Sequence, residues 1–476
     1  MASLKQHTLG GLNLKTSPLN NEGQILRALN VERDLNGAWQ KRPGYVTYLG
    51  TPDNAQVTSL FSWRQNDDTL ITYRKSGGTL YYSTAGTGSW TIAGGGTLTA
   101  ASHVGNIVLD NVIILGDGTA ATRHSVGTTA GAAGTSFTNT SGAPLAEHFS
   151  EYQGRVWAAR GTAVMGTNTD MFYSTVGTAT DWTTDSSSIR IPGAGRINSL
   201  YKVGGNLVPT KDSGLIFTFD GYNLLDNSNN FGPSSPYSIG SFADAKFFLN
   251  RRGVFQHLGG VPQLKSTPVE KQIFNNAGSG IAGTVFDNAP GVVHKYNYLL
   301  GVGTVTDDLT SYTIPDCVLR YDIRGDEWSN WKFAHRPYSF HSYRDRVGID
   351  QLVFGDNGGQ CYQLSGTATS DAGAAIEVQL MGVIHGNSLE EKDWRYLRGM
   401  FNPGNKAKLQ ISLSDTFTPR TLKWQDLGDA RDGVVEYHFP NGSRGVFLFW
   451  KAYEFSDTSR FECLGFEYEA ELVTHG

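Results

Sequence analysis

The sequence predicts an all-β fold, a β-propeller followed by a smaller β-sandwich-like module. The first observation behind this prediction is composition. Glycine supplies 58 of the 476 residues and aromatic residues 12 %, whereas charged residues make up only 17 %. Glycine adopts positive φ without steric cost, so this composition is typical of many short strands joined by tight turns. Stretches rich in Ala, Glu, Lys and Leu, which favour helical bundles, do not occur.

The second observation is a repeated phrase. Residues 82–91 read YSTAGTGSWT, and residues 173–183 repeat this as YSTVGTATDWT, 91 positions later. A looser copy, YDIRGDEWS, spans 321–329, a further 148 positions along. Each copy ends a strand in an aromatic residue, turns at a glycine and returns through a tryptophan. The two intervals are close to two and three units of about 45–50 residues, the period of propeller blades.

The third observation is a recurring hairpin pattern from Gln56 to Leu364, in which an apolar run, a turn with Gly, Asp or Asn, and a second apolar run follow one another. The pattern predicts six blades if two weak segments share one blade, and seven if they do not. The candidate blades are 56–94, 99–140, 148–192, 195–237, 241–290, 291–335 and 337–367. Residues 127–142 are of low complexity and predict an exposed loop.

Residues 1–50 predict an extended β segment ahead of the propeller. Leu29 and Val31 alternate with polar neighbours, which is the period of a strand. Asn36-Gly37 is a strong hairpin signal, and a second strand is expected through Trp39.

The sequence pattern changes at 366–374. Beyond this point the runs of alternating apolar and polar residues become longer, as in a β-sandwich. We therefore expect three parts: an N-terminal β segment over 1–50, a propeller over 51–367 and a sandwich-like module over 368–476. In the last strand the expected inward residues are Phe466, Tyr468 and Ala470, and the expected outward residues are Glu467, Glu469 and Glu471.

Charge and cysteine content restrict the function further. The net charge is −5, the pI is about 6.1, and no run of five Lys or Arg occurs, so a tight grip on phosphates is not expected. Cys317, Cys361 and Cys463 are widely spaced and predict reduced, half-buried strand residues. No apolar run approaches 18 residues, and the start lacks the apolar region of a secretory signal. We expect synthesis in a cytoplasm.

No protease, hydrolase, phosphate-loop or EF-hand motif occurs, so the sequence predicts no catalytic, cofactor-binding or metal-binding residue and no enzyme. His335 and His341 are too irregularly placed for a ligand pair, and hydrogen-bonded or solvent-facing histidines are favoured. Gly94-Gly95-Gly96 lacks the Lys and the helix of a phosphate cradle. Asp117 and Asp356 each provide one carboxylate, which favours turn chemistry over calcium binding.

Two groups of residues leave alternatives open. The phrases at 82–91 and 173–183 partly resemble the sialidase Asp box, but Ala85 and Val176 occupy the Asp position. Trp63, Tyr81 and Trp331 are candidates for exposed aromatic residues that stack on sugars, and packing between blades is favoured for such residues. Arg42 is interpreted either as a contact to a partner's carboxylates or as part of a solvated turn, with equal weight.

Several phrases, in order, resemble the tail hub (nozzle) proteins of short-tailed, podovirus-type bacteriophages, also called packaged-DNA stabilisation or tail tubular proteins. At the N-terminus these are GGLNL at 10–14, SPL at 17–19, ALNVERD at 28–34 and GAWQKRPGY at 37–45. Within the propeller they are QGRVW at 153–157 before the phrase at 172–182, and AKFFLNRRGVF at 245–255 before VEKQI at 269–273. The resemblance covers nearly the whole chain, although insertions of the larger family members are absent.

The resemblance implies a structural virion protein of the phage tail, synthesised in the host cytoplasm and without a cofactor. Six copies would form a ring below the portal and the adaptor, continue the DNA ejection channel and retain packaged DNA. The implied partners are the adaptor ring, a tail fibre, tailspike or tail needle, and double-stranded DNA that passes without sequence-specific binding. Propellers would stand outside as pillars around a tube built by the terminal segments, and a mildly acidic chain suits a lumen for DNA.

Two other functions remain open. One is a propeller-type carbohydrate-binding or glycosidase-like protein. The other is a receptor-binding or baseplate propeller of another phage tail.

Overall fold

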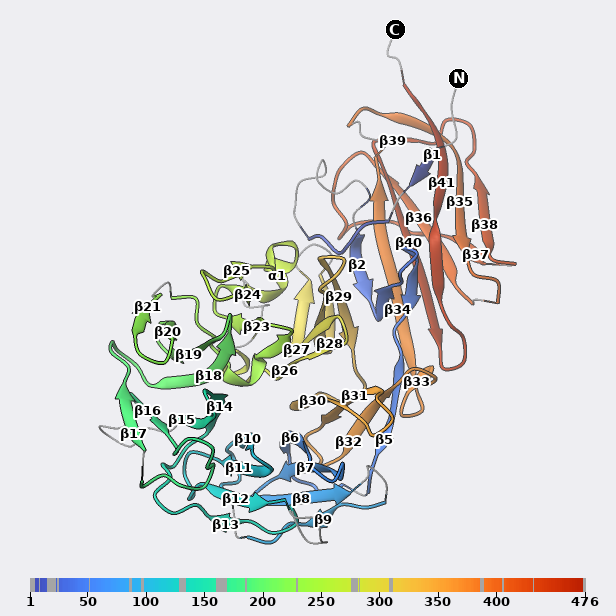
Figure 1. The fold of residues 1–476 in the computed structure, drawn as a ribbon. Helices are drawn as coiled ribbons and strands as arrows, with labels where there is room; N and C mark the ends of the chain where they lie inside the picture. The colour runs from blue at the N-terminus through green and yellow to red at the C-terminus, as the bar shows by residue number, and fades with distance from the viewer. Residues whose placement is uncertain are drawn as a thin grey trace.

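The structure is a computed structural model with a ring of β-sheets and an elongated β module attached to one side of the ring (Figure 1). It describes residues 5–7, 9–14, 23, 25–50, 52–84, 88–95, 98–127, 134–159, 169–184, 186–227, 230–274, 281, 283–307, 311–385, 389–404, 406–430 and 432–473. Residues 17–19, 85–86 and 128–133, which the sequence analysis used, lie outside this part. The described helices are short: α1 (Glu270–Ile273), α2 (Gly283–Asn288), η2 (Pro236–Ser238) and η3 (Thr267–Val269).

Five separate four-stranded antiparallel sheets form the blades in the first part of the ring. The first two contain β6 (Val57–Arg64), β7 (Leu70–Ser76), β8 (Thr79–Thr84) and β9 (Thr91–Ile92), then β10 (Gly105–Leu109), β11 (Val112–Gly116), β12 (Arg123–Val126) and β13 (Thr138–Asn139). The third contains β14 (His148–Tyr152), β15 (Arg155–Ala159), β16 (Asp170–Tyr173) and β17 (Ser187–Arg190). The fourth and fifth contain β18 (Ile197–Val203), β19 (Asn206–Lys211), β20 (Phe217–Phe219) and β21 (Leu224–Asp226), then β22 (Gly240–Phe242), β23 (Ala245–Asn250), β24 (Gly253–His257) and β25 (Gln263–Leu264).

Two further four-stranded groups continue the ring, and both belong to a 14-stranded sheet. One contains β26 (Gly291–His294), β27 (Asn297–Asp307), β28 (Tyr312–Asp322) and β29 (Glu327–Lys332). The other contains β30 (Ser339–Arg344), β31 (Asp350–Gly355), β32 (Cys361–Ser365) and, from the N-terminal segment, β5 (Gly44–Tyr48). β30 lies against β26 on one side and β6 on the other. The propeller fold is therefore confirmed. In the described part of the chain seven four-stranded groups form the ring, the count expected if no two of the candidate segments share a blade.

Tight turns explain the short strands. Gly204 and Gly205, with φ of +57° and +77°, join Val203 to its hydrogen-bonded partner Asn206. Positive φ at both central residues is the requirement of the type I′ hairpin, whose twist matches that of the strands.

The repeated phrase marks the same place in three blades, the connection from the third to the fourth strand. It follows β8, β16 and β28. In the third copy Trp328 is the cross-strand partner of Tyr321, and their rings lie 5.0 Å apart. The phrase thus marks a structurally equivalent turn in these three blades.

The second module is a sandwich of two sheets. One sheet extends the 14-stranded sheet through β2 (Ile25–Leu29), β33 (Ser370–Asp371), β34 (Ala374–Ile384), β40 (Phe447–Ser456), β36 (Lys408–Ser414) and β37 (Gln425–Asp429). The other, seven-stranded sheet contains β1 (Lys5–His7), β3 (Val31–Arg33), β4 (Trp39–Lys41), β35 (Lys392–Phe401), β38 (Val434–His438), β39 (Arg444–Gly445) and β41 (Glu462–Leu472). The Trp450 and Phe466 rings meet between the sheets, with centroids 4.2 Å apart.

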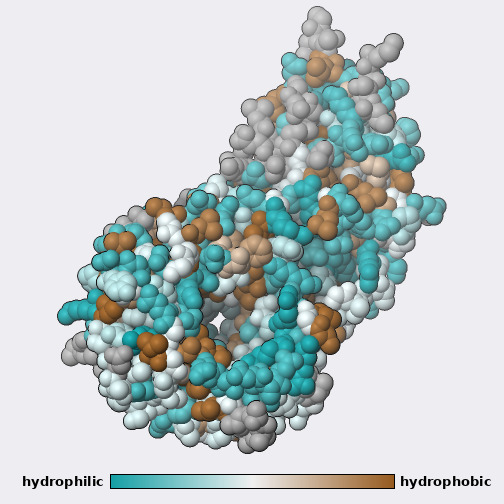
Figure 2. All heavy atoms as spheres, viewed as in Figure 1, coloured by the Kyte–Doolittle hydropathy of each residue, from teal (hydrophilic) through white to brown (hydrophobic). Residues whose placement is uncertain are grey.

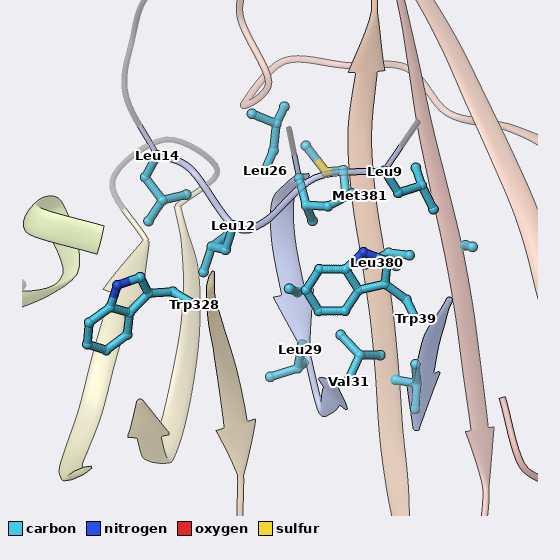
Figure 3. Close-up of a cluster of buried hydrophobic side chains, with 14 of the residues drawn as sticks. Leu9, Leu12, Leu14, Leu26, Leu29, Val31, Trp39, Trp328, Leu380 and Met381 are labelled. Atoms are coloured by element: carbon cyan, nitrogen blue, oxygen red, sulfur yellow. The ribbon is translucent and has the colours of Figure 1, made fainter. Parts of the chain in front are cut away.

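The N-terminal segment passes through both modules. β2 pairs with β29 of the propeller on one side and with β34 of the sandwich on the other. β3 and β4 form the predicted hairpin, with Gly37 at φ +91°, and β5 then enters the last blade. Figure 3 shows Leu12 and Leu14 over the blade that carries Trp328, and Leu29, Val31 and Trp39 beside β34. One core cluster therefore spans the propeller and the sandwich.

Candidate functional site

A hollow runs through the ring of blades (Figure 2). The first strands of neighbouring blades form its wall, since β10, β14 and β18 lie side by side. Three adjoining cavities of about 780, 550 and 530 Å³ share residues from one to the next. Glu147, His148 and Tyr237 line the first and second, and His103 lines the second and third. These adjoining cavities make the channel a candidate binding site.

Three side chains from different blades meet in the channel. The rings of His103 and Tyr237 are stacked with centroids 3.5 Å apart, and the Tyr237 hydroxyl donates a hydrogen bond to Oε1 of Glu147. Burial raises the pKa of Glu147 and lowers the pKa of His103 to about 4. Burial and the Glu147 charge both raise the pKa of Tyr237. At neutral pH His103 is therefore uncharged, and Tyr237 keeps its proton and acts as a hydrogen-bond donor rather than as a nucleophile.

A buried lysine lies behind this wall. Lys75 Nζ donates hydrogen bonds to Oγ1 of Thr58, to the carbonyl of Ala100 and to the carbonyl of Ser102. Burial lowers its pKa to about 8. Because three acceptors match its three N–H groups, Lys75 holds neighbouring segments together and presents no free amine to the channel.

Several of the charged groups near the channel form ion pairs. Arg196 Nε lies 3.3 Å from Oδ2 of Asp212, and Arg251 Nη2 lies 3.0 Å from Oδ1 of Asp287. Such exposed pairs carry little net charge, so the channel suits neutral, hydroxyl-bearing ligands more than anions.

Among the described residues no group of three or more His, Cys, Asp or Glu could hold a metal ion. None of the helices in that part of the chain is long and apolar enough to cross a membrane.

The structure supports packing, the favoured interpretation, for the candidate aromatic residues. Trp63 and Trp331 are buried, so neither is available to stack on a sugar. Tyr81 is half-buried and lies under the Arg74 guanidinium, 4.6 Å from the ring centroid. All three serve packing, the interpretation favoured for such residues.

The candidate ligand residues also have structural roles. His341 contacts Oγ of Ser62, and His335 contacts the Tyr45 hydroxyl. Asp117 accepts hydrogen bonds from the backbone N–H groups of residues 99, 119 and 120, and Asp356 from those of residues 358 and 360. These are turn contacts, as predicted.

The expectation that the cysteines are half-buried is wrong. Cys317, Cys361 and Cys463 are fully buried and free, and burial raises the pKa of each thiol, for Cys361 and Cys463 to about 12. They are therefore small core residues without reactivity.

Both interpretations of Arg42 are wrong, because it is neither solvated nor free for a partner. Nη1 and Nη2 donate to Oδ1 and Oδ2 of Asp371 at 2.9 and 2.6 Å, and Nε donates to Oδ1 of Asn30. The carbonyls of Pro43 and Lys332 accept the remaining N–H groups. Arg42 is 1 % exposed. It does bind a carboxylate, but one that its own chain supplies where the propeller meets the sandwich.

No sequence pattern pointed to the channel group. His103, Glu147 and Tyr237 come from three blades, and Glu147 and Tyr237 are 90 positions apart. Each lies at the start of a blade's first strand or just before it, and this shared position was the one available signal.

Comparison with known proteins identifies no family for the chain. No protein-family model matches the chain, and no curated protein matches its sequence. Similar solved structures include the computationally designed Ika8 protein, at 12 % identity over 67 % of this chain and 99 % of that one, with a TM-score of 0.40. YCF48 bound to D1 peptide matches at 11 % identity over 67 % of this chain and 95 % of that one, with a TM-score of 0.41. Raptor from Chaetomium thermophilum matches at 11 % identity over 68 % of this chain and 29 % of that one, with a TM-score of 0.44. These similarities carry no functional argument, and the propeller assignment rests on the strand pairing.

Proposed function

We propose that this protein is a structural component of a phage tail, the hub that continues the DNA channel below the adaptor as a ring of six copies. The observation that carries the proposal is the path of residues 25–48, which join the sandwich and close the last blade. A rod-like sandwich fixed to a propeller by shared strands suits a tube wall with an external pillar. β1 and β41, the first and the last described strands, pair in the sandwich away from the ring (Figure 1), so they are placed for contacts along a tube.

The outer face of the seven-stranded sheet supports a passage for DNA. Glu467, Glu469 and Glu471 alternate on β41, and neighbouring strands add Asp393 and Glu436. Arg395 and Arg398 are the two cations paired with this row. Arg444 lies opposite Asp393 on the same face and adds a third guanidinium group. Five carboxylates against three guanidinium groups leave the face mildly acidic, which weakens the adhesion of a polyanion and lets it slide.

The test is electron cryo-microscopy of the full chain combined with the portal–adaptor complex of a short-tailed phage. We expect six copies in a ring on the axis, with sandwiches around the lumen and propellers outside. A chain that does not join this complex, or that lies off the axis, contradicts the proposal. Tyr237→Phe in the propeller channel is the control, because a structural hub does not need that hydroxyl.

A charge change tests the assigned lumen face. The triple variant Glu467→Lys, Glu469→Lys and Glu471→Lys should slow DNA ejection in low salt, and high salt should reduce the effect. The matched control reverses Asp426 and Asp429 on β37 of the opposite sheet and should leave the rate unchanged. Equal effects of the two variants would place the lumen elsewhere.

A second candidate is carbohydrate binding in the propeller channel, which the His103–Tyr237–Glu147 group favours because it combines aromatic rings with hydrogen-bonding groups. A glycan array with the full chain tests it. Binding that is lost in both Glu147→Gln and Tyr237→Phe would support this candidate, and an array without binding would remove it.

A further inference from the structure

A second pocket lies outside the channel, where the N-terminal segment meets the propeller. Its volume is about 520 Å³, in the range of pockets that hold ligands. The β3–β4 turn with Leu35 forms one side, and Leu299, Leu364 and Trp331 line other parts of it. Arg320 and Asn297 contribute polar groups to the same pocket.

Strand register explains why these polar groups lie together. Asn297 pairs with Asp322, and Leu299 pairs with Arg320, across β27 and β28. Arg320 in turn pairs with Ser329 on β29. Side chains alternate between the faces of a sheet, so Asn297, Arg320 and Ser329 belong to the same face of this blade.

The buried polar atoms on this face are incompletely partnered. Arg320 is 1 % exposed; its Nη2 donates to Oδ2 of Asp322 at 2.9 Å, while its Nε lies 3.9 Å from Oε2 of Glu32. Within the described residues, Nε and Nη1 of Arg320, Oδ1 of Asn297 and Oγ of Ser329 have no hydrogen-bond partner. Leaving a buried polar group unmatched costs about 1–3 kcal/mol, and more for a charged group, so such a cluster needs an occupant that completes it.

The charges around the pocket favour a neutral occupant. The cations are Arg33, Lys295, Arg320 and Arg324, and the carboxylates that line the pocket or pair with these cations are Glu32, Asp34, Asp322 and Glu327. Four positive and four negative groups cancel, so no net field selects an anion or a cation. The unmatched atoms instead require an acceptor for the Arg320 N–H and a donor for the Asn297 carbonyl.

We propose that this pocket binds a peptide segment of a partner protein through one amide group. The amide oxygen accepts a hydrogen bond from Arg320 Nη1, and the amide N–H donates to Oδ1 of Asn297. The two residues are diagonal neighbours across the strands, with their Cβ atoms about 7–8 Å apart or somewhat less, and both line the pocket. Leu35 and Tyr296, both exposed beside the pocket, contact the flanking side chains of the segment. The inference does not depend on the proposed function.

The test uses the full chain and ligand-observed saturation-transfer NMR with capped tripeptides. The probes are acetyl-Ala-Gln-Ala-amide, with acetate and glucose as non-amide ligands. We expect saturation transfer to the peptide alone, and at least a tenfold loss of affinity in Asn297→Leu and in Arg320→Met. Asn297→Leu keeps the Arg320–Asp322 pair, so the test stands even if Arg320→Met fails to fold.

The matched control is Asn206→Leu, because Asn206, like Asn297, opens the second strand of a blade hairpin and is half-buried. This variant should bind the peptide as the parent does. Absence of transfer to the peptide, equal transfer in Asn297→Leu, or transfer to acetate or glucose that Asn297→Leu abolishes would each overturn the proposal. A crystal structure with ordered water alone on Arg320 after peptide soaking would do the same.

Discussion

Arg42 and Arg320 are two buried arginines on the same tryptophan, and they differ in how well they are partnered. Each guanidinium carbon lies 6.0 Å from the Trp331 ring centroid, and each residue is 1 % exposed. Arg42 uses all five N–H groups on protein acceptors. Arg320 leaves Nε and Nη1 without a hydrogen-bond partner among the described residues.

The difference separates a structural contact from a binding contact. A buried charge that is fully paired ties elements together, and removing one member leaves the other uncompensated. A buried charge that is partly paired facing a pocket keeps hydrogen-bonding capacity for another molecule. The following predictions test this distinction, from the largest expected effect to the smallest.

Arg42→Met should have the largest effect on stability. Asp371 is 3 % exposed and would keep little beyond a contact to the N–H of Ala334 at 3.4 Å. Breaking a buried pair in this way costs about 3–5 kcal/mol. Native-state hydrogen exchange should show this loss in β4 and β5, the strands before and after Arg42 in the chain. Arg344→Met, at an exposed pair with Asp350, is the control and should change opening by less than about 0.5 kcal/mol.

Arg320→Met should destabilise its blade less than Arg42→Met destabilises the junction. Asp322 loses one partner but still accepts hydrogen bonds from the backbone N–H groups of Arg324 and Gly325, at 3.0 and 3.2 Å. We expect a loss of about 1–3 kcal/mol, measured by hydrogen exchange in β27 and β28. A loss as large as that of Arg42→Met would mean that both arginines contribute equally to stability as structural contacts.

Sequence reasoning located the parts of the fold that depend on local pattern. The repeated aromatic-glycine-tryptophan phrase marked the turn between third and fourth strands, and Asn36-Gly37 marked a hairpin. The alternation in β41 was confirmed at Phe466 and Tyr468, which are buried, and at Glu471, which is exposed. Each of these signals involves only a few neighbouring residues, so it can be recognised in the sequence alone.

The sites depend on residues that are far apart in sequence. Arg42 and Asp371 are 329 positions apart, and Arg42-Pro43-Gly44 has the composition of an exposed turn. Its burial follows from β5 crossing back into the last blade, which no local pattern encodes. The same holds for the Arg320 pocket, where register alone brings Asn297 and Ser329 to one face. Pairing between residues far apart in the chain therefore forms both the Arg42 contact and the Arg320 pocket, and composition does not predict it.

A change at His257 would test whether burial keeps a titratable side chain of the propeller uncharged. It is fully buried, its Nδ1 lies 3.1 Å from the Tyr201 hydroxyl, and burial lowers its pKa to about 4. In the unfolded chain its pKa is about 6.5, so between pH 6.5 and 4 the unfolded state binds more protons and stability falls as the pH falls. Within that window the free energy of unfolding falls by up to about 1.4 kcal/mol for each step of one in pH. His257→Asn, which keeps a hydrogen-bonding group near the Nδ1 position, should flatten this pH dependence in chemical unfolding. An unchanged slope would show that other groups carry it.

Asn297→Leu should have the smallest effect on stability, although the same change should abolish peptide binding. In the parent the Asn297 carbonyl is buried without a partner among the described residues, so replacing the amide by an alkyl group of similar size removes an unmatched acceptor rather than a contact. We expect a change within about 0.5 kcal/mol, of either sign, in hydrogen exchange of β26 and β27. A loss of more than about 2 kcal/mol would mean that Asn297 is partnered in solution as fully as Arg42, and the contrast between the two regions would disappear.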